Sequence, residues 1–292
     1  MNHYCYRKID AFTSGESTGN PAACIYLEGN EKLSPDDMLA VAKQHKGFVS
    51  EVVFCRGEGE GFHLTYYSSE CEVDFCGHGT IACMYSLISE RDELLSRDEI
   101  SIATNRKGAL TVYNEVASRD AVFIMAPKPL YIGTTLDGAT IADALGAPVV
   151  APSPERPIDL IDAGLRTLIV PVSSLQNEID LFPDEKSLKK FCLANDIDII
   201  LIYSLEVENK TNKAHTRVFA PKFGYLEDPA TGSGNSAFGY YMLKNNLWGG
   251  ESISLEQGGR DRVFNRVMLG TRGGLVLFGG SATTRIKGEY FF

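Results

Sequence analysis

The chain has 292 residues, of which 44% are hydrophobic and 23% are charged, and its formal net charge at pH 7 is -10. This balance is typical of a globular enzyme with one large or two ordinary domains, and the acidic excess argues against a nucleic-acid partner. The sequence contains neither a run of 18 apolar residues nor a basic leader followed by an apolar run, so we expect a cytoplasmic protein without a membrane span.

The first half of the chain alternates short strands with two helices. Ser34 followed by Pro35 predicts a helix that ends near Gly47, and a second helix is expected to begin at Gly79. Apolar runs predict strands at 22–27, 52–55, 62–67, 100–103, 110–113 and 121–125.

A segment rich in proline separates the two halves. Six of the twelve prolines fall between residues 127 and 157, where we expect a crossing segment with one short helix near 140–145. The second half then repeats the order of the first, with helices expected at 184–194 and after Gly232. Its predicted strands are 168–172, 199–203, 214–219, 253–256, 267–269 and 275–278.

The repeated order indicates an internal duplication. Gly79 and Gly232 are 153 positions apart, and the same offset separates Tyr66 from Phe219. We therefore expect one domain at 1–126 and another at 127–281, with a final strand at 282–292 that returns to the first domain. Because each glycine opens a helix, and helix starts carry free N–H groups and partial positive charge, two such starts facing one cleft would bind a small anion.

The seven cysteines predict reduced thiols, because their number is odd and their spacing irregular. Cys71, Cys76, His78 and Cys83 are close enough in sequence to raise the question of a structural zinc site. Such sites nearly always contain a C-x-x-C pair, which this sequence lacks. The sequence therefore predicts no metal.

Glu51 is the first candidate for chemistry, since it stands at the head of an otherwise apolar strand. A carboxylate there costs free energy unless it is paired or useful, and a shielded carboxyl suits general acid/base catalysis. Asp228 is the second candidate, because Pro229 holds it outside the helical conformation. The alternatives are an exposed glutamate at a strand start and an aspartate that only caps the next helix.

Cys76 and His78 belong to the first glycine turn. An imidazole between Gly77 and Gly79 is uncrowded and suits proton transfer or donation to a substrate oxygen, although a surface histidine is the simpler interpretation. A thiol near a helix start is easier to ionise, although most free cysteines are small buried hydrophobes. At the offset of 153, Cys76 corresponds to Pro229, so no opposing thiol is expected.

Familiar cofactor and nucleophile motifs are missing. The sequence has no G-x-x-x-x-G-K-[ST] loop, no G-x-S-x-G elbow and no G-x-G-x-x-G turn placed between a strand and a helix. We therefore expect chemistry by side chains alone, without a cofactor.

Five short motifs stand out along the chain: Asp10-Ala11-Phe12-Thr13, Gly19-Asn20-Pro21-Ala22-Ala23, Phe48-Val49-Ser50-Glu51, Cys76-Gly77-His78-Gly79-Thr80 and Asp228-Pro229-Ala230-Thr231-Gly232-Ser233. Together they resemble the phenazine-biosynthesis isomerase family, the PhzF-like proteins, over essentially the whole chain. The resemblance implies an α+β fold of two pseudo-symmetric domains, each a mixed, mostly antiparallel β-barrel around a central helix, as in diaminopimelate epimerase and proline racemase. It also implies a homodimer, no cofactor, and Glu51 as the residue that moves a proton with help from Asp228.

The sequence departs from the epimerase relatives at the second glycine loop. Those relatives use two opposed cysteines; Cys76 matches the first, and Pro229 is expected in place of the second. A turn at Glu256-Gln257-Gly258-Gly259-Arg260 resembles a glutamine-glycine-arginine turn of the family with one glycine added, and we assign it no substrate role.

We therefore expect an isomerase that moves a proton on a small carboxylate-bearing substrate. The alternatives are an amino-acid racemase or epimerase that uses Cys76, and a carboxylate-binding protein without activity. The expected catalytic residues are Glu51, Asp228 and Cys76, and the expected substrate-binding residues are Gly77, His78, Gly79, Thr80, Gly232, Ser233 and Gly234.

Overall fold

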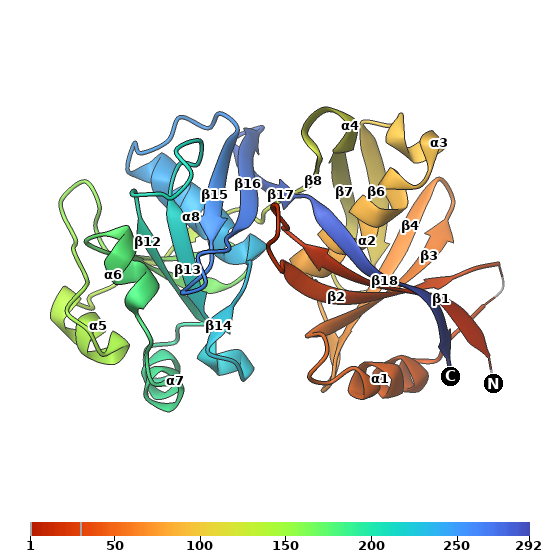
Figure 1. The fold of residues 1–292 in the computed structure, drawn as a ribbon, viewed down its shortest axis with the longest axis horizontal. Helices are drawn as coiled ribbons and strands as arrows, with labels where there is room; N and C mark the ends of the chain where they lie inside the picture. The colour runs from red at the N-terminus through yellow and green to blue at the C-terminus, as the bar shows by residue number, and fades with distance from the viewer. Residues whose placement is uncertain (1, 30) are drawn as a thin grey trace. The chain divides into compact units, whose positions relative to one another are not determined.

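The computed structural model of the chain describes residues 2–29 and 31–292. It contains two compact units, of which one runs to Ile124 and includes Gly279–Phe292, while the other is Met125–Phe278. In each unit a mixed, mostly antiparallel sheet surrounds one buried helix, so the fold is α+β (Figure 1). None of the helices in the described ranges combines the length and apolarity needed to cross a membrane.

The first unit contains the N-terminal elements and the last strand of the chain. Its elements are β1 (His3–Ala11), β2 (Asn20–Leu27), α1 (Pro35–Gln44), β3 (Glu51–Glu58), β4 (Gly61–Ser68), β5 (Glu72–Val73), α2 (Gly77–Ser89), α3 (Asp92–Leu95), β6 (Glu99–Thr104), β7 (Gly108–Glu115), α4 (Val116–Arg119), β8 (Ala121–Met125) and β18 (Ala282–Phe291).

The second unit contains the remaining elements. They are β9 (Leu130–Tyr131), α5 (Gly138–Leu145), β10 (Asp159–Asp162), β11 (Arg166–Pro171), α6 (Leu175–Asp180), α7 (Glu185–Ala194), β12 (Ile199–Ser204), β13 (His215–Phe219), a 3₁₀ turn at Pro221–Phe223, β14 (Glu227–Asp228), α8 (Gly232–Lys244), β15 (Ile253–Gln257), β16 (Asn265–Arg272) and β17 (Leu275–Gly280).

Strand pairing repeats between the units. In the first unit β2 and β3 are parallel, β3 and β4 antiparallel, β4 and β6 parallel, and β6 and β7 antiparallel. In the second unit β11 and β12, β12 and β13, β13 and β15, and β15 and β16 show the same alternation. The expected pseudo-symmetry of the fold is therefore confirmed at the level of the backbone.

The central helix of each unit consists mostly of apolar or small residues, and it is buried on nearly every face. Helix α2 packs against β1, β2, β3 and β18, and its Ile81, Met84 and Ile88 are fully shielded from solvent. Helix α8 packs against β10, β11, β12 and β16, and its Phe238 and Tyr241 are equally shielded. Each helix therefore forms the core of its unit.

Helix α1 begins directly after the cap that the sequence predicts, Ser34. Ser34 accepts a hydrogen bond from the Asp37 amide, and the Asp37 carboxylate accepts one in return from the Ser34 amide. Helix α5 begins at Gly138, capped by Asp137, two residues before the predicted start.

The sequence did not predict strand β1, because buried charges interrupt its apolar pattern. Arg7 donates to Ser86 Oγ at 2.6 Å and to Glu90 Oε2 at 2.7 Å, while Asp10 accepts from Arg285 Nε at 2.9 Å. These partners offset the cost of burying charge, and they come from α2 and β18. A single-sequence pattern cannot show them. Short elements β9, β10, α3, α4 and α6 were missed as well.

Candidate active site

The N-terminus of α2 holds the thiol of Cys76 in place. Cys76 is the N-cap residue with an extended backbone (φ -128°, ψ 107°), and its Sγ accepts from the Gly79 amide at 3.3 Å. A Cβ added at Gly79 would lie 2.8 Å from Val53 Cγ2 and 2.9 Å from Cys76 Sγ. Glycine at this position therefore lets the helix start lie directly against the thiol and β3.

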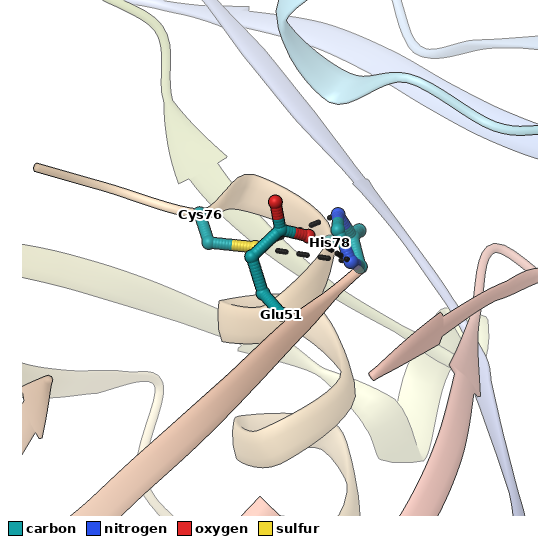
Figure 2. A group of neighbouring side chains, drawn as sticks. All are labelled: Glu51, Cys76 and His78. Carbon is teal, nitrogen blue, oxygen red and sulfur yellow. Dashed lines mark hydrogen bonds and ion pairs between the residues drawn. The ribbon is translucent and has the colours of Figure 1, made fainter. Parts of the chain in front are cut away.

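Glu51 reaches the same place from the sheet. It is the first residue of β3, paired with Ala22 on β2 and Ser68 on β4. Its side chain is 21% exposed, and its Oε2 atom lies 3.3 Å from His78 Nε2. Glu51 is therefore not an exposed glutamate at a strand start, because its carboxylate points at the first glycine turn (Figure 2).

His78 lies within 4 Å of both the carboxylate and the thiol. Its Nδ1 and Nε2 atoms are 3.5 Å and 3.8 Å from Cys76 Sγ, and its side chain is 14% exposed. Burial lowers the pKa of His78 to about 4, although a hydrogen bond from the ring to the Pro21 backbone carbonyl acts in the opposite direction. The imidazole is therefore neutral near pH 7, with one nitrogen able to donate and the other able to accept.

The cluster of Glu51, Cys76 and His78 thus brings together a carboxylate, a thiol and a neutral imidazole (Figure 2). The first turn of α2 contains no acidic residue, so its amides retain their positive potential. An anion at Gly77 or His78 would be attracted to these amides while its carbon skeleton lay beside the cluster.

The second glycine turn shows that the sequence repeat has a different register. Thr231 is the N-cap residue of α8, with backbone angles (φ -123°, ψ 113°) close to those of Cys76. The two N-caps are 155 positions apart, so Cys76 corresponds to Thr231 and His78 to Ser233. The prediction that Pro229 corresponds to Cys76 is wrong, because the second half has extra residues between β13 and β14, whereas the loops 74–76 and 229–231 before the two helices have the same length. The second loop still lacks a thiol.

Asp228 lies in β14, paired with Val218 on β13. Its Oδ2 accepts from the Thr231 hydroxyl at 2.7 Å. Asp228 is therefore not the N-cap residue of α8; instead it binds the side chain of that residue.

The expected substrate-binding residues differ in exposure. Gly77, His78 and Ser233 are partly exposed, whereas Gly79, Thr80, Gly232 and Gly234 are buried. The Thr80 hydroxyl donates to the Cys76 carbonyl at 2.7 Å and bonds Tyr66 Oη at 2.7 Å. The side chain of Thr80 therefore supports the turn from inside.

Gln257 is a functional candidate to which the sequence assigned no role. Its Oε1 accepts from the Thr231 amide at 2.9 Å and from Asn235 Nδ2 at 2.6 Å, and its Nε2 donates to the Asp228 carbonyl at 2.8 Å. The side chain is fully buried, so it fixes the loop before α8. The glutamine in the motif at 256–260 was visible, but its partners were not.

Comparison with known proteins decides the family. A family model described as phenazine biosynthesis-like protein matches residues 9–274. The chain belongs to the phenazine biosynthesis-like family. It is 32% identical over 238 residues to an uncharacterised isomerase, YfhB, of Bacillus subtilis, covering 80% of this chain and 79% of that one. The names carried by such relatives support an isomerase.

Solved structures share the fold over the full length of the chain. A PhzF-family protein of Bacillus anthracis covers 100% of both chains with a TM-score of 0.85 at 22% identity. A probable proline racemase of Agrobacterium radiobacter, solved with bound carbonate, has a TM-score of 0.61 at 11% identity, covering 99% of this chain and 92% of the other. The expected similarity in fold to the racemases is confirmed.

Proposed function

We propose that the protein is a cofactor-independent isomerase that moves a proton on a small carboxylate-bearing substrate, with Glu51 as the acid/base group. One observation carries the proposal: the Glu51 carboxylate lies 3.3 Å from the imidazole of His78, at the N-terminus of α2. A proton-transfer reaction needs a base near a site that binds and stabilises negative charge, and this arrangement supplies both.

The proposed reaction begins with the substrate carboxylate at the first turn of α2. Glu51 takes a proton from a carbon activated by that carboxylate or by a conjugated double bond. The electron pair left behind is delocalised into the substrate, where the amides of the turn and the neutral imidazole stabilise the charge. Glu51 then returns the proton to a different carbon, so the substrate gains and loses nothing overall.

Asp228 has a supporting part in the proposal. The family resemblance implies an assisting acid at this position, and the Thr231 hydroxyl holds the Asp228 carboxylate in a fixed orientation. We propose that Asp228 assists proton transfer from the turn before α8.

The test is deuterium uptake from D₂O by a panel of cyclic and acyclic carboxylates incubated with the wild-type protein, followed by mass spectrometry. We expect at least one compound that binds saturably to gain carbon-bound deuterium. If members of the panel bind saturably and none of them gains deuterium at full occupancy, the result would contradict an isomerase and favour the carboxylate-binding alternative.

The second candidate is an amino-acid racemase or epimerase that uses Cys76. The hydrogen bond from the Gly79 amide to Cys76 Sγ favours it, because a helix start stabilises a thiolate. Since Thr231 stands where a second thiol would be needed, Glu51 would have to supply the other base. This candidate predicts that Cys76→Ser no longer exchanges the α-proton of an amino acid, whereas Cys71→Ser still does. Equal exchange by the two variants would eliminate it.

A further inference from the structure

The cluster of Glu51, Cys76 and His78 has a property that proton transfer does not require. Its three ligand atoms, one oxygen, one sulfur and one nitrogen, all lie within 4.8 Å of one another. We propose that this cluster is a three-ligand binding site for Zn²⁺, and that the bound metal inhibits the protein.

The spacing of the ligand atoms fits a tetrahedral ion. Usual bond lengths around Zn²⁺ place the nitrogen and oxygen ligands of a tetrahedron about 3.3 Å apart and the nitrogen and sulfur ligands about 3.6 Å apart. In the structure, His78 Nε2 lies 3.3 Å from Glu51 Oε2 and 3.8 Å from Cys76 Sγ. These two distances therefore fit a tetrahedral ion to within a few tenths of an ångström, and the third, between the Glu51 oxygen and Cys76 Sγ, is at most 4.8 Å.

The chemical state of the ligands also suits zinc. The imidazole of His78 brings a ring nitrogen to within 3.3 Å of the Glu51 carboxylate and 3.8 Å of the Cys76 thiol. The hydrogen bond from its ring to the Pro21 carbonyl orients the imidazole, as commonly found for histidines that bind metals. Glu51 and a Cys76 thiolate together balance the two charges of the ion, which offsets the unfavourable helix dipole.

The donor set selects among metals. Sulfur and imidazole ligands favour zinc and related borderline ions over Mg²⁺ and Ca²⁺, which prefer oxygen. Three protein ligands leave one tetrahedral position open for water or a substrate carboxylate. The sequence argued against a structural zinc site at Cys71, Cys76, His78 and Cys83, because no C-x-x-C pair is present. Glu51 is 25 positions before Cys76 and was not considered.

Bound Zn²⁺ would inhibit the proposed reaction, because the metal and the substrate proton need electron pairs of the same carboxylate. A Glu51 carboxylate that coordinates the metal could not accept the proton. This consequence rests on the proposed function, but the binding site itself does not.

The test uses Co²⁺ as a spectroscopic substitute for Zn²⁺, added to metal-free, reduced full-length protein. We expect the intense visible absorption of tetrahedral cobalt with a thiolate-to-cobalt charge-transfer band, both abolished by Zn²⁺. Glu51→Gln, Cys76→Ser and His78→Gln should each weaken binding by at least the roughly 10–100-fold that changes around metal sites cost. The matched controls Glu70→Gln, Cys71→Ser and His3→Gln should bind as the wild type does, because these side chains lie outside the cluster.

Three results would overturn the inference: no saturable cobalt binding by the wild type, an octahedral spectrum, or a charge-transfer band that survives Cys76→Ser. The last would assign the thiolate to another cysteine, such as exposed Cys71. Circular dichroism of each variant separates loss of a ligand from loss of folding. Since the readout is absorption, cobalt binding without deuterium exchange would contradict the proposed function alone, and exchange without cobalt binding would contradict the metal site alone.

Discussion

At the scale of the residue, single buried polar groups fix the two glycine turns. The Thr80 hydroxyl does so for the first turn and the Gln257 amide for the second. Each satisfies backbone groups that a glycine-rich loop cannot pair by itself. The turns are therefore pre-organised by residues that have no need to touch a substrate.

Replacing Gln257 by leucine should destabilise the protein by at least about 2 kcal/mol, because each buried group left without its partner costs about 1–3 kcal/mol. Urea unfolding would measure the change. Gln176→Leu is the matched control, since Gln176 is exposed. Equal unfolding midpoints for the two variants would show that Gln257 does not fix the loop.

Sequence alone could single out Glu51, Cys76 and His78, but it could not show that they meet. Glu51 is aligned with the first turn of α2 by the pairing of β3 with β2 and β4, and that register depends on the folded sheet. The register of the duplication was set wrongly for the same reason. Matching glycines by one constant offset ignored that the connection between β13 and β14 is longer than the connection between β4 and β5, a difference that the N-caps reveal.

At the scale of the element, the contact between α2 and β3 positions the thiol. Gly79→Ala places a Cβ within 3.0 Å of both Val53 and Cys76, so the helix start must move. We expect the free energy of unfolding to fall by about 1–3 kcal/mol, as for other overpacked sites. Thermal unfolding measures this change, and Gly288→Ala on β18 is the control, because nothing lies within 4 Å of an added Cβ there. A Gly79→Ala protein as stable as this control would contradict the packing.

Helix α6 buries an acid that the sequence did not reveal. Glu178 Oε1 lies 3.1 Å from His215 Nδ1, and both side chains are fully shielded. Burial raises the pKa of Glu178 well above 4.5 despite nearby Arg217, while Glu227 and Glu256 raise it further. Burial also lowers the pKa of His215 from 6.5 to about 4. At a pH below the raised pKa of Glu178 and above the lowered pKa of His215, the pair is therefore a neutral acid beside a neutral imidazole.

The pair predicts how stability depends on pH. A carboxyl whose pKa is raised by folding stabilises most below its unfolded value of 4.5, and stability is lost as the pH rises above it. A histidine whose pKa is lowered by folding costs stability as the pH falls from 6.5 toward 4.

Glu178→Gln should abolish the loss of stability that the wild type shows as the pH rises above 4.5, and it should keep the loss of stability at falling pH. Near pH 4.5 a neutral amide replaces a neutral acid, so the free energy of unfolding should change there by about 1 kcal/mol or less. The free energy of unfolding measured against pH checks this, with exposed Glu185→Gln as the control. If the free energy of unfolding falls equally steeply with rising pH in the wild type and in Glu178→Gln, the neutral pair is contradicted.

At the scale of the whole molecule, the chain closes its first unit with its last strand. Strand β18 pairs with β1 from His3 and Phe291 to Ala11 and Ala282, and α2 packs against both strands. The sequence indicated an extra strand at 282–292, because it had no counterpart in the first half. The homodimer implied by the family resemblance stays a prediction, which light scattering can check.

Removing residues 282–292 should expose the edge of β1 and one side of α2. We expect hydrogen exchange of the β1 and α2 amides to accelerate strongly, whereas amides of β11, β12 and β13 serve as the internal reference because their pairing lies wholly in the second unit. Unchanged protection of β1 and α2 in the shortened protein would show that β18 is dispensable to the first unit.

The central claim is that the Glu51 carboxylate moves the proton. The most direct measurement is the rate of carbon-bound deuterium exchange by Glu51→Gln, with a ligand that the wild type exchanges and at concentrations that saturate both proteins. The account predicts retained binding and an exchange rate lower by about 10²–10⁴-fold, the usual contribution of a positioned acid/base group. Exchange at the wild-type rate in Glu51→Gln would contradict it.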